Sequence, residues 1–120
     1  MSFRRVLKEL EAKLTPDGLA PAIRNATGKL EYKHYGDGKQ RLKFRCRGLE
    51  LPDGEPLELT SGDALIVVLE VEAGRVSIDE ERDIAAEAPP LAVGNTVALR
   101  RNGDSLLSGL VYLDSVSYTH

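Results

Sequence analysis

The sequence predicts a mainly β fold: an antiparallel β-sandwich, or a small barrel, of about seven strands with one N-terminal amphipathic helix. Short segments of alternating apolar and polar residues recur from residue 28 onward, and turn signals containing Gly, Asp or Asn separate them at fairly even spacing. The run ALIVVLEV at residues 64–71 is rich in β-branched residues. We expect it to be a central strand covered on both faces, with a buried helical turn as the alternative.

Length and composition indicate a single domain with a hydrophobic core, since the chain has 120 residues of which 42% are hydrophobic. Cys46 is the only cysteine, which excludes an internal disulfide bond. The N-terminal residues are charged, unlike a signal peptide, and no apolar stretch approaches the length of a membrane span. We therefore expect a cytoplasmic protein with no membrane span, although a chain trimmed of its leader would look the same.

The predicted helix occupies residues 1–15. Ser2 is a suitable N-cap, and Thr15 ends the helix because the residue before Pro16 is pushed out of the α region. A helix this short is marginal in water by itself, so its apolar stripe must cover its own β domain, a protein partner, a second copy of the chain or a membrane surface. The stripe consists of Phe3, Val6, Leu7, Leu10 and Leu14.

The rest of the chain divides into three parts. Residues 16–27 are a connector with a Pro-Asp-Gly turn signal at its start. Residues 28–114 form the β domain, in which residues 80–90 lack a strand pattern and are predicted to be a loop. Residues 115–120 are a polar tail that we expect to be flexible.

The clearest strands are the first two of the β domain. Leu30, Tyr32 and His34 share one face of the first, and a Gly-Asp-Gly-Lys hairpin signal at residues 36–39 follows it. After residue 47 the apolar positions change from even to odd numbers, which indicates a β-bulge at Gly48. The second strand points Leu42, Phe44 and Cys46 inward and Arg41, Lys43, Arg45 and Arg47 outward.

Later strands show the same alternation more briefly. Leu57 and Leu59 mark one short strand, and residues 76–78 and 97–99 mark two more. Asn102 and Gly103 form a strong hairpin signal before a last strand at residues 105–114 that is apolar on both sides.

Residues 26–54 read ATGKLEYKHYGDGKQRLKFRCRGLELPDG, which runs from Ala-Thr-Gly through a strand, a polar hairpin and a second strand to Gly-Leu. This order resembles the opening of CHRD-type β domains. The resemblance implies an antiparallel β domain of a bacterial family and implies no activity. The paired histidines on which a metal-binding role has been supposed for such domains are absent from this sequence, so that role is not carried over.

Charge is distributed unevenly along the chain. Residues 1–47 hold 12 Lys and Arg against 5 Asp and Glu, a balance of +7, whereas residues 48–120 hold 4 against 14, a balance of −10. Basic strands that pair with acidic strands in one fold would explain this difference. A basic surface that receives an anionic partner is the alternative explanation.

The main candidate site is the outward face of the second strand, where Arg41, Lys43, Arg45 and Arg47 lie about 7 Å apart along the strand. Lys29, Lys33 and Tyr35 extend this basic face on the neighbouring strand, with the tyrosine ring as a platform for stacking. Three glutamates are available to neutralise it from other strands. These are Glu58, Glu70 and Glu72.

No catalytic residue, metal ligand or cofactor is predicted. His34 reads as an ordinary strand histidine, and no Gly-x-Ser-x-Gly motif accompanies it. Cys46 alternates with Leu42 and Phe44 and therefore reads as a buried apolar residue. The acidic run IDEERD at residues 78–83 lacks the glycine and the distant glutamate of an EF-hand, so a solvated loop is favoured over calcium binding.

Two functional hypotheses follow. The first is a non-enzymatic interaction or assembly module that binds a protein partner, or a second copy of itself, through the N-terminal helix and the basic face. The alternative is a binder of an anionic ligand or polyanion through the basic face at residues 41–47. We do not expect nucleic acid as the partner, because the chain is acidic, with a pI near 5.4, and poor in aromatic residues.

Overall fold

The computed structural model describes residues 6–83 and 91–113, with only the backbone described at residues 82 and 83. These residues form eight strands and no helix, so the mainly β prediction is confirmed, while seven strands and an N-terminal helix are not. All neighbouring strands are antiparallel. The strands are β1 (Val6–Pro16), β2 (Thr27–Tyr35), β3 (Lys39–Arg47), β4 (Pro56–Ser61), β5 (Ala64–Glu70), β6 (Val76–Asp83), β7 (Thr96–Arg101) and β8 (Asp104–Leu113).

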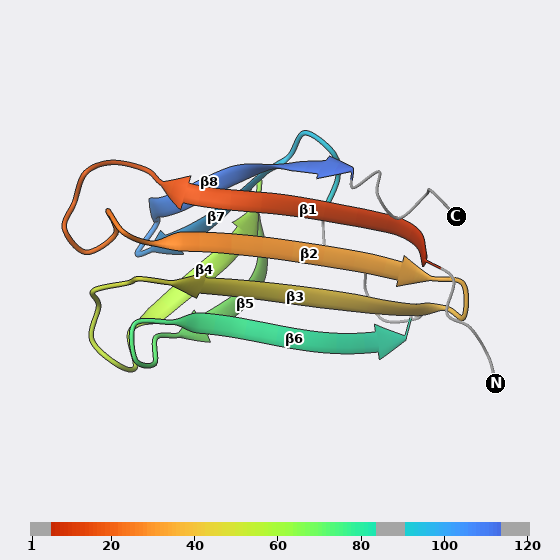
Figure 1. Ribbon diagram of the computed structural model, residues 1–120, viewed down its shortest axis with the longest axis horizontal. Helices are drawn as coiled ribbons and strands as arrows, with labels where there is room; N and C mark the ends of the chain where they lie inside the picture. The colour runs from red at the N-terminus through yellow and green to blue at the C-terminus, as the bar shows by residue number, and fades with distance from the viewer. Residues whose placement is uncertain (1–5, 84–90, 114–120) are drawn as a thin grey trace.

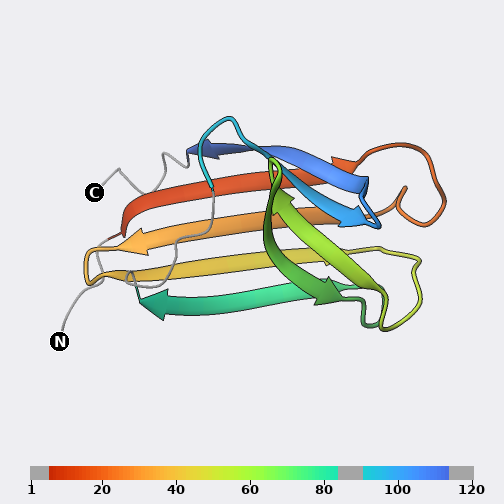
Figure 2. The ribbon, with the colours of Figure 1, turned by 180° about the vertical axis from the view of Figure 1, so that it is seen from behind.

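One continuous sheet with the order β5-β4-β7-β8-β1-β2-β3-β6 contains all eight strands. Strands β1, β2, β3 and β6 form one layer, and β4, β5 and β7 lie behind it (Figure 1). Seen from behind, β4 and β5 cross this layer obliquely (Figure 2). The edge strands β5 and β6 are joined by a tight turn in which Glu72 and Arg75 exchange backbone hydrogen bonds. The sheet is therefore nearly closed and resembles the small barrel that was the alternative to the predicted sandwich.

The hydrophobic core fills the space between the two layers. Buried side chains alternate along β2 and β3, as expected when one face of a sheet is covered, whereas consecutive residues are buried at 97–99 on β7 and at 59–61 on β4. The residues between β1 and β2 and those after β3 add Ile23, Ala26 and Leu49 to the core. The largest buried side chains from the strands include Leu10, Leu14, Leu30, Phe44, Leu57, Leu59, Val97, Leu99 and Leu107.

The predicted helix is instead strand β1, apart from residues 1–5, including Phe3, which lie outside the described part of the chain. Leu10, Ala12 and Leu14 are buried in a period of two, whereas Leu7 is 49% exposed. Leu10 and Leu14 fit both a helical stripe and a strand face, so the local pattern was ambiguous. Residues 6–16 form a strand rather than a helix because their backbone pairs with β2 on one side and with β8 on the other.

The apolar run at residues 64–71 is not a central strand, because β5 is at one end of the sheet order. Leu65 and Val68 are each 52% exposed, while Leu69 and Val71 are buried. The prediction of cover on both faces was therefore wrong. High apolar content reports the tendency to form a strand, whereas the position in the sheet depends on which other strands pair with it.

The two ends of β3 test two local predictions, the hairpin before it and the bulge at Gly48. Gly38 N–H donates to the carbonyl of Tyr35 at 3.2 Å in the predicted hairpin between β2 and β3. The phase change at Gly48 occurs, but it marks the end of β3 rather than a bulge inside it. Gly48 has a φ of +80°, and a Cβ there would lie 2.4 Å from the carbonyl oxygen of Asn25, so only glycine fits.

The predicted loop at residues 80–90 is partly wrong. Residues 80–83 belong to β6, which pairs with β3 along eight consecutive residue pairs. Their acidic sequence lacks apolar alternation, so the strand is recognisable only through its basic partner. Residues 84–90 and the predicted tail at 115–120 lie outside the described residues.

Strand β8 comes very close to β1 at Gly109. A Cβ at this position would lie 1.9 Å from the carbonyl oxygen of Lys13, so no side chain fits there without moving the backbone. On either side of this point β8 pairs with β1, and it also pairs with β7 through residues 104–110. Gly109 therefore lies where one strand joins the two layers.

The strand assignment of β1 predicts a difference between two leucines that share the helical stripe. Leu10→Ala should lower the free energy of unfolding by about 2–5 kcal/mol, because it leaves a cavity in the core. Leu7→Ala, on the same strand, should cost less than about 1 kcal/mol because the side chain is half exposed. Urea denaturation of both variants measures this, and equal losses would contradict the assignment.

The close approach of β8 to β1 predicts that Gly109→Ala lowers the free energy of unfolding by at least about 2 kcal/mol through steric overlap. Gly54→Ala is the control: Gly54 has a positive φ but open space around its α-carbon, so its cost should be limited to about 1 kcal/mol of backbone strain. Urea denaturation distinguishes the two, and a Gly109→Ala variant as stable as Gly54→Ala would show that the strands can separate there.

Candidate functional site

The outer face of β1, β2, β3 and β6 carries a groove that follows from strand register. Leu14, Gly28, Cys46 and Val76 pair across the four strands in one line, and all four are buried. Successive side chains of a strand point to opposite faces, so the outer surface above this line is bare backbone. Exposed side chains stand on both sides: Lys13, Lys29, Arg45 and Ser77 form one wall, and Thr15, Thr27, Arg47 and Arg75 form the other.

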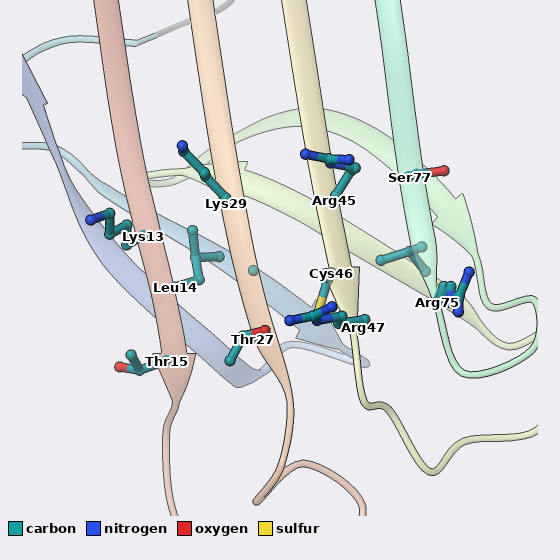
Figure 3. A pocket seen from close by; sticks show the side chains of 12 residues that line it. Lys13, Leu14, Thr15, Thr27, Lys29, Arg45, Cys46, Arg47, Arg75 and Ser77 are labelled. Atoms are coloured by element: carbon teal, nitrogen blue, oxygen red, sulfur yellow. The ribbon is translucent and has the colours of Figure 1, made fainter. Parts of the chain in front are cut away.

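This groove has a volume of about 760 Å³ and is lined by these twelve residues, as Figure 3 shows. Its length across four strands is about 14 Å, from three strand spacings, and its walls stand about 7 Å apart along each strand. The volume is typical of a small-molecule site. The groove is partly open to solvent.

The groove is strongly basic. Two lysines and three arginines line it, and none of the described residues that line it is acidic. The three arginines come from β3 and from the turn before β6, so the guanidinium groups gather at one end of the groove, and Lys13 lies at the other (Figure 3). We call the twelve lining residues the basic groove.

Beyond the groove, Arg41 and Lys33 on the same sheet face are paired with carboxylates, whereas Lys43 forms no ion pair among the described residues. Arg41 donates two hydrogen bonds to Asp79, from Nε to Oδ1 at 2.9 Å and from the second terminal nitrogen to Oδ2 at 2.7 Å. Arg41 holds the pKa of Asp79 below its usual range, so this pair persists until the pH becomes acidic enough to protonate the carboxylate. Lys33 lies 3.4 Å from Glu9 in a second ion pair.

Lys29 belongs partly to the groove and partly to this region of paired charges. Its ammonium nitrogen lies 3.3 Å from Glu31 and 3.7 Å from Glu11. A hydrogen bond to Glu31 and the charge of Glu11 raise the pKa of Lys29. Lys29 is thus already compensated.

The other four cations of the groove differ from Lys29. Within the part of the chain that the structure describes, Lys13, Arg45, Arg47 and Arg75 form no ion pair. Glu58, Glu70 and Glu72, which were predicted to neutralise the basic face, lie on β4, on β5 and in the turn after β5. Strand β6 is the neighbour of β3 instead, and it supplies Asp79.

The structure divides the predicted basic face into two parts. Arg45 and Arg47 line the basic groove, whereas Lys33, Arg41 and Lys43 surround a much smaller hollow of about 70 Å³ together with Glu31. Tyr35 is only 8% exposed, so its ring is not an open platform for stacking. The outward orientation of the four basic side chains of β3 is confirmed by the burial of the residues between them.

Sequence reasoning missed five of the eight exposed residues that line the groove: Lys13, Thr15, Thr27, Arg75 and Ser77. Lys13 and Thr15 were assigned to a helix, where they had no relation to the basic strand. The alternation of Leu10, Ala12 and Leu14 was the signal that could have placed them on an outward strand face. Arg75 and Ser77 required knowledge that β6 pairs with β3.

Other candidate positions offer less. His34 is half-buried on β2, and the described residues contain no group of three or more His, Cys, Asp or Glu that could hold a metal ion. Residues 6–83 and 91–113 contain no helix long and apolar enough to cross a membrane.

The sequence matches no model of a known protein family and no individual curated protein.

Cys46 lies under the groove and is 2% exposed, as predicted from its alternation with Leu42 and Phe44. Burial raises the pKa of its thiol to about 11. The thiolate is the reactive form of cysteine, so both the burial and the raised pKa oppose reaction.

Cys46 therefore should react slowly with a chromogenic disulfide reagent at pH 8 in the native protein and rapidly in urea. The raised pKa of Cys46 in the folded protein also makes stability depend on pH. The neutral buried thiol contributes fully to the free energy of unfolding below pH 9, and this contribution is lost as the pH rises toward about 11. Urea denaturation across this range should show a steeper loss of stability for the native sequence than for Cys46→Ala. Rapid labelling without denaturant would contradict the burial.

Proposed function

We propose that this chain is a non-enzymatic binding module that holds an anionic ligand in the basic groove. The observation that carries the proposal is the uneven neutralisation of one sheet face. Arg41, Lys33 and Lys29 form ion pairs with carboxylates, whereas Lys13, Arg45, Arg47 and Arg75 form none within the described residues, and Arg45 interacts with Asp79 only through charge at longer range. Like charges gathered without counterions repel one another, so an anion that enters the groove relieves this repulsion.

The arrangement of donors also supports an anionic ligand. Arginine presents a planar fork of N–H donors that suits carboxylate, sulfate and phosphate groups. Arg45 and Arg47 come from β3 and Arg75 from the turn before the adjacent β6, so one anionic group can contact more than one of them. Thr15, Thr27 and Ser77 add hydroxyl groups along the same walls.

The assembly hypothesis has lost its main support. It relied on an amphipathic helix with a free apolar stripe, and the described residues of that stripe belong to β1, where Leu10 and Leu14 are buried in the core. A protein partner with an acidic surface, including a second copy of this chain, remains one source of the anion. Light scattering with and without heparin distinguishes the two. A dimer in the absence of heparin indicates a bound second copy, and a monomer that gains mass only with heparin indicates a bound ligand.

Heparin, as a broad polyanion probe, tests the proposal. Arg45→Gln and Arg47→Gln should each weaken heparin binding about tenfold, since each removes a charge-assisted hydrogen-bond donor from the groove. Affinity should fall as the salt concentration rises. Isothermal titration calorimetry at several salt concentrations measures both effects.

Arg41→Gln is the matched control for this experiment. It makes the same chemical change on the same strand, but its guanidinium is already paired with Asp79. It should change heparin affinity less than about threefold. Equal losses for the three variants, or no binding by the native chain, would argue against a groove-specific anion site.

A further inference from the structure

On the basis of the proposed function, we infer that the ligand is a flexible linear chain of tetrahedral oxyanions, phosphate or sulfate, that crosses β1, β2, β3 and β6 at right angles to the strands. The bare backbone above Leu14, Gly28, Cys46 and Val76 sets the direction. A ligand that follows this line lies between two walls of exposed side chains. A ligand that follows one strand would instead run from the groove toward Arg41 and Asp79, where the charges are already paired.

Cations on both walls favour a ligand that carries charge on all sides. Lys13, Lys29 and Arg45 stand on one wall, and Arg47 and Arg75 stand on the other. A tetrahedral phosphate or sulfate in a chain presents oxygens to both walls at once, whereas a planar carboxylate presents its two oxygens in one direction. The threonine and serine hydroxyls of the walls can donate to the remaining oxygens.

The lining contains no aromatic side chain among the described residues, and Tyr35, the nearest candidate considered from the sequence, is almost completely buried. Proteins that bind single-stranded nucleic acid stack bases on exposed aromatic rings, and this contributes about 1–3 kcal/mol per base. The groove offers contacts for a charged backbone and none for bases. A polyanion without bases therefore fits it better than a nucleic acid does.

The two ends of the groove differ in a way that can be tested. Arg45, Arg47 and Arg75 form the stronger end. Lys13 lies at the other end, three strands away from β6, beside Lys29, which is already paired with Glu11 and Glu31. A short chain should occupy the arginine end alone. A chain that spans about 14 Å should also reach Lys13 and bind more tightly.

Calorimetry with tripolyphosphate and with a longer polyphosphate tests this arrangement. Arg47→Gln should weaken binding of both chains about tenfold. Lys13→Gln should weaken binding of the longer chain about threefold and leave tripolyphosphate within about twofold of the native value. Lys8→Gln is the control, because Lys8 is an exposed cation of β1 that does not line the groove, and it should leave both affinities unchanged.

Sulfated heparin oligosaccharides, polyglutamate and single-stranded DNA of matched charge separate the possible chemistries. Tighter binding of polyphosphate identifies phosphate as the source of the oxyanions, and tighter binding of heparin oligosaccharides identifies sulfate; either result supports the inference. Equal or tighter binding of polyglutamate or DNA would overturn it and leave the groove as an anion site. Equal effects of Lys13→Gln on short and long chains would also overturn it. If Arg45→Gln and Arg47→Gln weakened binding no more than Arg41→Gln does, the proposed function would be overturned instead.

Discussion

The pairing of β1 with β8 connects the two layers of the sheet, because β8 also pairs with β7 in the other layer. The close approach of β8 to Lys13 at Gly109 makes this connection possible, since any side chain there would overlap the β1 backbone. The same stretch of β1 buries Leu14 in the core and points Lys13 and Thr15 outward. The pairing that joins the two layers therefore also places one end of the basic groove.

Strand pairing, rather than the total number of charged residues, decides which cations on the outer face are paired with carboxylates. The acidic β6 lies beside the basic β3, and Arg41 is held by Asp79. Opposite Arg45, β6 carries Ser77 instead of a carboxylate. No carboxylate lines this end of the groove within the described residues. The first explanation of the charge asymmetry, opposite charges paired between strands, therefore applies to one half of this face, and the other half is the basic surface for which we propose an anionic ligand.

Much of the local structure was predictable because it depends on residues close in sequence. The alternation in β2 and β3, the hairpins at residues 36–39 and 102–103, and the burial of Cys46 all follow from a period of two and from turn-forming residues. The candidate site was found only in part. Arg45 and Arg47 were predicted by their outward positions, whereas Lys13 and Arg75 join them only through pairing between strands distant in sequence.

The sequence by itself determined that the chain is mainly β, where its turns lie and which side chains of β3 face outward, because these properties follow from local steric preferences and alternation. The tertiary structure decided that residues 6–16 form a strand, because Leu10 and Leu14 satisfy both a helical and an extended pattern and only pairing with β2 and β8 distinguishes them. It also decided that the apolar run at 64–71 lies largely on an edge strand. Finally, it decided which cations form ion pairs, because ion pairing depends on the strand that lies alongside.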